Sequence, residues 1–297
     1  MSQTTPPAAA VSRLPVLTIV RHANTIALGQ PGVLARAATL PFLLSMAIAA
    51  LTVTTPAFPL ISVFLAVAGL APYAIFGVAW CRFVLYGPDA GRPPLFPFWA
   101  RAHWRYFGYL AALAFIAFGL VVPPLLLVTF QAVVAADAAD SASALLIFTL
   151  GELAVILAVA VLMVRLSFVF PAAAADEIYT WRHSWAHTRG QGLRLLAAIA
   201  LSVAPAIAVL WVVSSIFGIF SFPEIDPAVV REATSPDQVI GDYLAANAGH
   251  LAVAQVAMTA MSYLVLGVAL AAIALAFRIG TGWVPPAAPL APPSAPV

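Results

Sequence analysis

The sequence is poor in charged residues and contains no lysine. Only 8% of its 297 residues are charged, its 13 basic residues are all arginine, and its 11 acidic residues leave a net charge of +2. A soluble globular domain has about 25% charged residues, so this chain lacks the polar residues needed to cover a surface in water. The small net charge provides no strong field to attract nucleic acid, and we expect no nucleic-acid partner.

Cysteine and the common catalytic motifs are also scarce. The single cysteine, Cys81, excludes an internal disulfide framework, and we expect it to be a small buried apolar residue. The sequence has no G-x-S-x-G, H-E-x-x-H, G-x-x-x-x-G-K-[ST] or G-x-G-x-x-G motif. The sequence therefore predicts no catalytic residue, no metal, no cofactor and no enzyme.

Long apolar runs are present instead, because 63% of the residues are hydrophobic. A transmembrane helix needs roughly 18 or more apolar residues, and six runs satisfy this. They are long, rich in alanine and leucine, and lack the alternation of a barrel strand, which favours helices. The predicted fold is all-α: a polytopic membrane protein with six transmembrane helices. The runs are 37–55, 60–85, 106–134, 144–170, 193–220 and 251–277.

The arginines are distributed unequally between the two sides of this arrangement. The side that holds both termini carries every arginine except Arg231, which shares the other side with seven acidic residues. Cytoplasmic loops carry the excess of arginine, so we expect both termini in the cytoplasm and a multi-pass protein of a bacterial inner membrane. The twelve arginines are Arg13, Arg21, Arg36, Arg82, Arg92, Arg101, Arg105, Arg165, Arg182, Arg189, Arg194 and Arg278.

The spans are predicted to form three hairpins, with interfacial amphipathic helices on the cytoplasmic side before spans three and five. Trp99 to His103 and Trp185 to Arg189 precede these spans at an offset of 86 residues, as an internal repeat would require. Chance similarity between apolar helices remains the alternative. We divide the chain into a cytoplasmic segment with a candidate interfacial helix (1–35), the transmembrane domain (36–279) and a disordered Pro/Ala-rich tail (280–297). Residues 1–12 lack the pattern of a cleavable signal peptide.

The most distinctive stretch lies between spans four and five. It reads Arg-Leu-Ser-Phe-Val-Phe-Pro from Arg165, then Asp176-Glu177, then Trp-Arg-His-Ser-Trp-Ala-His-Thr-Arg-Gly from Trp181. This stretch resembles the bacterial YciC-like group and the membrane domain of glycerophosphodiester phosphodiesterase-like proteins. The resemblance implies a six-span inner-membrane protein without an established reaction. The matching residues are Arg165, Pro171, Ser184, Trp185, Thr188, Arg189 and Gly190.

Local rules give this stretch a structural interpretation. Pro171 is expected to end span four, and Asp176 and Glu177 are expected near the start of the next helix, where acids favour the positive end of the dipole. Gly190 is expected to cap that helix at its C-terminus.

An interfacial anchor is predicted in the same stretch. Trp181 and Trp185 are four residues apart and should share a helix face. Arg165 and Arg189 should extend their charged heads to the headgroups. The lipid bilayer is thus the expected partner, with other membrane proteins as further candidates.

One ionisable residue, Glu152, lies deep within a predicted span. An intramembrane acid is a functional-site hypothesis by default, and Gln255 in span six lies at a comparable depth, so the two form a candidate polar site. Ser262 and Tyr263 are alternative partners. The competing interpretation is a protonated acid that joins two helices by hydrogen bonds.

His183 and His187 are spaced i, i+4, which suits metal chelation. A third firm ligand is missing from the sequence, so we predict no metal and keep a lipid-modifying enzyme only as a third hypothesis. The leading hypothesis is an integral inner-membrane protein that organises the envelope or acts as a partner subunit. The alternative is a small transporter or channel with Glu152 lining a polar path.

Overall fold

The computed structural model describes residues 13–54, 59–87, 99–135, 141–216, 241 and 245–286. Within them six helical segments are long and apolar enough to cross a membrane, which confirms the predicted all-α polytopic fold. These segments are Pro31–Thr52, Leu60–Tyr86, Arg101–Pro124, Thr149–Ala174, Gly192–Val212 and Ala248–Thr281. The helices are α1 (Val16–Gly29), α2 (Pro31–Thr54), α3 (Pro59–Ala68), α4 (Leu70–Tyr86), α5 (Arg101–Ala135), α6 (Ser141–Leu166), α7 (Val169–Ala174), α8 (Trp181–His187), α9 (Gly192–Ile216) and α12 (Ala248–Thr281).

The spans form the three predicted hairpins. Helix α2 packs against α4, α5 against α6, and α9 against α12. Helix α12 lies at the centre, where it also contacts α1, α2 and α4. In the apolar stretch of the α12 span, 56% of the residues are buried within the protein, whereas in that of the α5 span only 11% are. Helix α5 therefore lies at the periphery.

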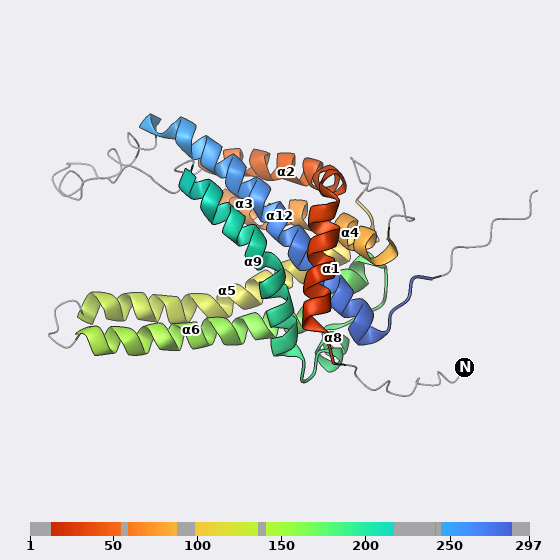
Figure 1. Cartoon of the computed structure of the whole chain (residues 1–297). Coiled ribbons are helices and arrows are strands. Elements are labelled where there is room, and N and C mark those ends of the chain that lie inside the picture. Colours follow the sequence, from red (N-terminus) through yellow and green to blue (C-terminus); the bar gives the residue numbers. More distant parts are fainter. Residues whose placement is uncertain are drawn as a thin grey trace, which may run out of the picture.

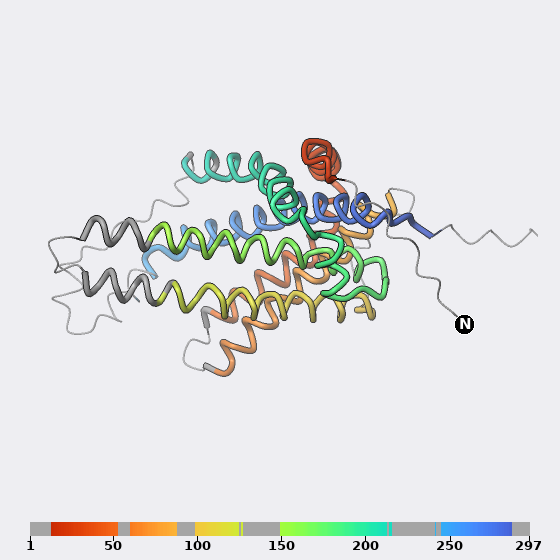
Figure 2. Tube along the Cα trace, turned by 90° about the horizontal axis from the view of Figure 1, so that it is seen from below, coloured from red at the N-terminus to blue at the C-terminus, as the bar shows by residue number. Residues whose placement is uncertain are grey.

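The two ends of the bundle differ in what they contain. One end, which we call the basic end, holds α1, α7, α8, the C-terminal ends of α4, α6 and α12, and the N-terminal ends of α5 and α9 (Figures 1 and 2). Ten of the twelve arginines assigned to one side lie in or beside these elements, and Arg36 lies near the N-terminal end of α2. Arg92, Arg231 and the seven acids of the other side lie outside the described residues.

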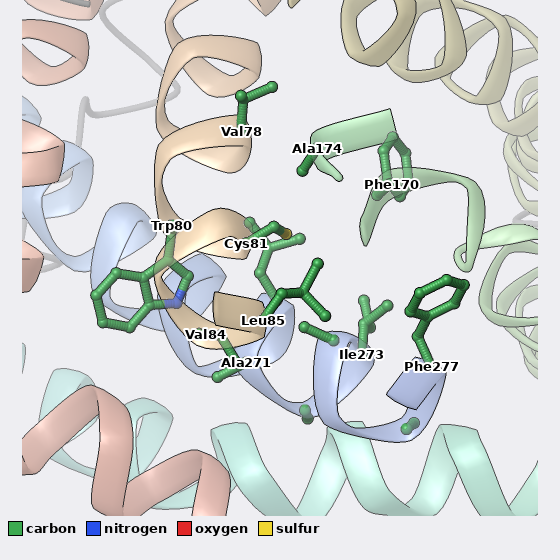
Figure 3. Close-up of a cluster of buried hydrophobic side chains, with 14 of the residues drawn as sticks. Val78, Trp80, Cys81, Val84, Leu85, Phe170, Ala174, Ala271, Ile273 and Phe277 are labelled. Atoms are coloured by element: carbon green, nitrogen blue, oxygen red, sulfur yellow. The ribbon is translucent and has the colours of Figure 1, made fainter. Parts of the chain in front are cut away.

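The protein core is concentrated at the basic end. Cys81 and Leu85 of α4 lie on the side of Ile273 and Phe277 of α12, Trp80 points to the other side of α4, and α7 adds Phe170 and Ala174 to the cluster (Figure 3). Cys81 is fully buried, as predicted. The indole Nε1 of Trp80 donates a hydrogen bond of 2.7 Å to the carbonyl of Gly267, so α4 and α12 are joined by both apolar packing and a polar contact.

Helix α1 lies across the bundle rather than along it (Figure 1). Ile19, Ala23 and Ala27 recur every four residues and form its buried stripe against α12 and α9, while Arg21 and His22 are exposed. This one-sided burial explains why a helix too short to span the membrane forms here. The candidate helix predicted within residues 1–35 is therefore present.

The other two predicted interfacial helices have different outcomes. Before span five the structure contains α8, a separate helix. Before span three the prediction is wrong for the described residues, because α5 begins at Arg101 and continues into the span without a break. At the C-terminus, α12 extends to Thr281 and Trp283 packs against Tyr86 and Phe277, so the ordered chain passes the predicted boundary at 280. Residues 287–297 of the predicted tail lie outside the described residues.

Span two is divided into α3 and α4 at Gly69. Pro72 lies three residues further on and has no N–H to donate to the carbonyl of Ala68. The proline ring also crowds that carbonyl, which accounts for a helix break at this place. The break lies about nine residues, or roughly 13 Å, into the span and thus near the middle of a bilayer.

Candidate functional site

The chain bends into the protein core near the end of span four. Helix α6 ends at Leu166, the chain bends at Ser167 and Phe168, and every residue of α7 is buried. The prediction that Pro171 ends the span is wrong, because Pro171 is the third residue of α7. A proline is tolerated in the first turn of a helix, where the missing N–H would have no intrahelical acceptor.

The predicted role of Asp176 and Glu177 at a helix start is also wrong. Both acids follow the C-terminus of α7, and α8 begins only at Trp181. Asp176 adopts φ = 60°, a left-handed conformation that aspartate tolerates better than most residues. Its carboxylate accepts a 2.5 Å hydrogen bond from Nη2 of Arg82. The acids therefore end α7 rather than start α8.

Arg82 links α4 to this turn by two contacts. Its Nε donates to the carbonyl of Ala174 at 2.7 Å, in addition to the ion pair with Asp176. Nη1 of Arg105 donates to the carbonyl of Asp176 at 3.4 Å, and Nε1 of Trp283 donates to Glu177 at 3.1 Å. Cations at the end of a helix satisfy carbonyls that have no intrahelical donor. Four segments of the chain thus meet at the α7–α8 turn.

The two histidines of α8 have structural partners. The backbone N–H of Thr180 donates to Nδ1 of His183 at 3.3 Å, and Nδ1 of His187 lies 3.0 Å from the hydroxyl of Tyr179. Burial raises the pKa of Tyr179, so its hydroxyl remains protonated at neutral pH. In the described part of the chain, no group of three or more potential metal ligands comes together.

The four predicted anchor residues separate into two places. The Arg165 guanidinium carbon lies 3.3 Å from the centre of the Trp185 ring, and the hydroxyls of Ser184 and Thr188 donate to the Arg165 carbonyl at 2.7 and 3.1 Å. Trp181 instead packs edge-on against Tyr109 of α5, with centroids 4.9 Å apart.

Arg189 and Gly190 complete the connection to α9. The Arg189 side chain is exposed. The prediction that Gly190 caps the helix is wrong for α8, whose C-cap is Thr188. Gly190 lies in the turn to α9 with φ = 71°, a left-handed backbone that strains most other residues.

The candidate pair Glu152 and Gln255 is not brought together. Glu152 is partly buried on α6, which packs against α5, α8 and α9. The Gln255 side chain is exposed on α12, and its amide donates to the hydroxyl of Thr259 at 3.2 Å. Figure 1 shows the N-terminal halves of α6 and α12 far apart. The two residues lie at a comparable depth in their predicted spans, but they are not close together because their helices belong to different hairpins.

Gln255 instead lines a groove that the sequence did not suggest. This polar groove has a volume of about 330 Å³ and lies where α2, the α3–α4 break and α12 meet. Gly69 and Tyr73 line it beside the break, and the hydroxyl of Ser45 lies 2.8 Å from that of Tyr263. Two pairs of polar residues in the sequence could have indicated this groove, because their spacing places each pair on one helix face. They are Ser45 and Thr52, seven residues apart on α2, and Gln255 and Thr259, four apart on α12. The polar residues that line the groove are Ser45, Thr52, Tyr73, Gln255 and Thr259.

Comparison with known proteins identifies no relative. No family model matches the chain, nor does any curated protein or solved structure. The resemblance to the YciC-like group therefore remains a prediction, and the function has to be argued from the structure.

Proposed function

We propose that the protein is a non-enzymatic subunit of a bacterial inner-membrane assembly, with its basic end in the cytoplasm. The basic end holds three hairpins in a fixed relation, and the α5–α6 hairpin offers its apolar surface to the helices of another integral membrane protein. An integral inner-membrane protein with six spans is also what the resemblance of the residues between Arg165 and Gly190 implies.

The observation that carries this proposal is the separation of the α5–α6 hairpin from the rest of the bundle. The two helices pack against each other but diverge from α2, α9 and α12 away from the basic end (Figure 1). Without a hydrophobic driving force inside the bilayer, helices associate through packing, so an unpacked hairpin is a surface where a partner helix can pack. Large exposed side chains on it are Phe115, Phe118, Leu126, Leu150 and Leu153.

The use of polar side chains supports a structural role. Ser184 and Thr188 donate to the backbone of Arg165, His183 accepts from the backbone at the start of α8, and Asp176 pairs with Arg82. Each of these groups has a packing or capping partner, which leaves it poorly placed as a nucleophile or a base.

In-cell photocrosslinking tests the proposal. A photoreactive amino acid is placed at Phe118 or Leu153 on the α5–α6 hairpin, and at Leu43 on α2 as a matched exposed control. We expect discrete protein adducts from the first two positions and none from Leu43. Lipid adducts alone at all three positions would contradict the proposal.

Reporter fusions test the orientation separately. A reporter after Asp140 and one after Arg182 should give signals from opposite compartments, since these positions flank span four. The cytoplasmic signal should come from Arg182, because arginines are retained on that side. The reverse assignment would place the basic end outside the cell.

A small transporter or channel is the second candidate, and the polar groove is the observation that favours it. Discontinuous helices near the midplane form the binding sites of many transporters, and the α3–α4 break faces Gln255 across this groove. Reconstituted protein should then pass a small polar solute, and Gln255→Leu should stop that flux while Gln191→Leu at the basic end does not. Glu152 would contribute only if flux also requires a proton or cation.

A further inference from the structure

Two guanidinium groups that pair with no carboxylate among the described residues lie where α6, α8 and α9 meet. Arg165 lies in the last turn of α6, and Arg189 follows α8. Among the described acids at the basic end, Asp176 pairs with Arg82 and Glu177 accepts a hydrogen bond from Trp283. Arg189 lies close enough to Arg165 for electrostatic repulsion between them. This corner therefore carries positive charge that no described acid compensates.

The Arg165 side chain is held in one position. Its guanidinium lies on the Trp185 ring, and Nη2 donates to the Trp185 carbonyl at 3.2 Å. Its methylenes lie against Gly192, where an added Cβ would come within 3.0 Å of Cγ. Nη1 has no acceptor in the described part of the chain. The guanidinium group is thus preorganised, and both N–H groups of Nη1 are available to a ligand.

The start of α9 adds to the positive potential. This helix has 25 residues and begins at Gly192, directly beside the Arg165 side chain. The N-terminal end of a helix carries a partial positive charge, so two cations beside it are costly when no anion is present. The helix end contributes to the field, and the two arginines define the site.

The surroundings of the two arginines indicate the source of the anion. Arg165 lies in the last turn of the apolar helix α6. Trp185 is 43% exposed and Leu193, in the first turn of α9, is 66% exposed. A soluble anion gains nothing from such apolar neighbours, whereas a lipid places its phosphate at the level of interfacial tryptophans and its chains below them.

We propose that Arg165 and Arg189 bind the phosphate of an anionic phospholipid headgroup, with Trp185 and Leu193 in contact with its glycerol and upper acyl carbons. Guanidinium groups bind phosphate through paired hydrogen bonds, and basic sites between helices at the cytoplasmic surface select anionic headgroups. The site lies at the basic end and does not depend on a partner at the α5–α6 hairpin.

Lipid titration of the purified full-length chain tests this site. Dioctanoyl phosphatidylglycerol is added to the protein in a non-ionic detergent, and bound lipids are counted by native mass spectrometry. We expect one saturable site, weakened about tenfold by Arg189→Gln, since charge-assisted hydrogen bonds contribute that much. Arg165→Lys keeps the charge but loses the planar donor pair, and it should weaken binding as well.

Arg182→Gln is the matched control, because Arg182 is an exposed arginine of α8 whose loss changes the net charge equally. It should leave the affinity unchanged. Equal weakening by Arg182→Gln and Arg189→Gln would reduce the effect to non-specific attraction and overturn the proposal. Competition by inorganic phosphate at the concentration of the lipid would overturn the assignment to a phospholipid.

Discussion

The basic end and the opposite half of the bundle are built on different principles. At the basic end, buried aromatic side chains, a buried helix and side-chain hydrogen bonds join segments far apart in the chain; Trp80 and Gly267, for example, are 187 residues apart. Away from it, α5 and α6 carry large exposed apolar residues, lie side by side and diverge from α2, α9 and α12 (Figure 1). The comparison teaches that helix insertion needs only an apolar sequence, whereas a fixed arrangement of helices needs specific contacts, which this chain concentrates at one end.

Removal of one tryptophan from each region tests this comparison most strongly. Trp80→Ala deletes a fully buried ring and its hydrogen bond to Gly267, and it should lower the free energy of unfolding by about 3–5 kcal/mol. Trp211→Ala on α9 removes a ring that is 64% exposed and should cost less than about 0.5 kcal/mol. Reversible unfolding in mixed micelles, followed by circular dichroism, measures both. Equal losses would show that the two regions do not differ.

Two substitutions at Asp176 distinguish the contribution of the ion pair to stability from that of the backbone conformation. Asp176→Ala loses the pair with Arg82 and replaces aspartate by a residue that tolerates φ = 60° less well, so it should cost about 1–2 kcal/mol. Asp176→Gly loses the same pair but accepts this backbone without strain, and it should cost clearly less. The pair contributes little by itself because both side chains are about half exposed. If glycine proves as harmful as alanine in thermal unfolding, the ion pair contributes more to stability than the backbone conformation does.

Ser184 tests a smaller contact at the same end. Its hydroxyl is buried and donates to the Arg165 carbonyl at 2.7 Å, but Thr188 donates to that same carbonyl. Ser184→Ala should therefore cost about 1 kcal/mol, the net worth of one hydrogen bond. The double variant with Thr188→Val should cost more than the sum of the single variants, since it leaves the carbonyl without either donor. Strict additivity would show that the two hydroxyls act separately.

The smallest effect is expected at Glu152, outside the basic end. Glu152→Gln keeps the shape of the side chain, and we expect a change in stability of at most about 0.5 kcal/mol. If the protein is a partner subunit, Glu152→Gln should also leave the flux of protons or cations into reconstituted vesicles unchanged. Loss of such a flux with normal folding would instead support the transporter.

The residues that could be assigned from sequence are those whose environment is set locally. The apolar runs predicted the six spans, because the bilayer rewards any sufficiently long apolar helix. Gly190 does adopt a left-handed backbone, which favours glycine whatever surrounds it, although the residue that caps α8 is Thr188. The burial of Cys81 followed from the apolar run around it, although its neighbours on α7 and α12 did not.

The failed predictions concern residues whose partners are distant in the chain. Asp176 was placed at a helix start because its nearest neighbours suggested one, yet Arg82, 94 residues earlier, is its partner. Gln255 was paired with Glu152 by depth alone, yet it faces α2 and the α3–α4 break. The sequence favours a helix end at Pro171 because six residues alone do not reveal that α7 is buried by other helices.

The sequence by itself determined that the chain enters a membrane, how many times it can cross and which ends carry the arginines. These properties depend on the transfer of each segment from water to lipid, which is nearly independent for each helix. Only the tertiary structure decided that α7 is buried in the core, that the α5–α6 hairpin separates from the bundle and that Arg165 lies on Trp185 within the electrostatic range of Arg189. Those outcomes depend on shape complementarity and on hydrogen bonds between distant segments, which no local pattern encodes.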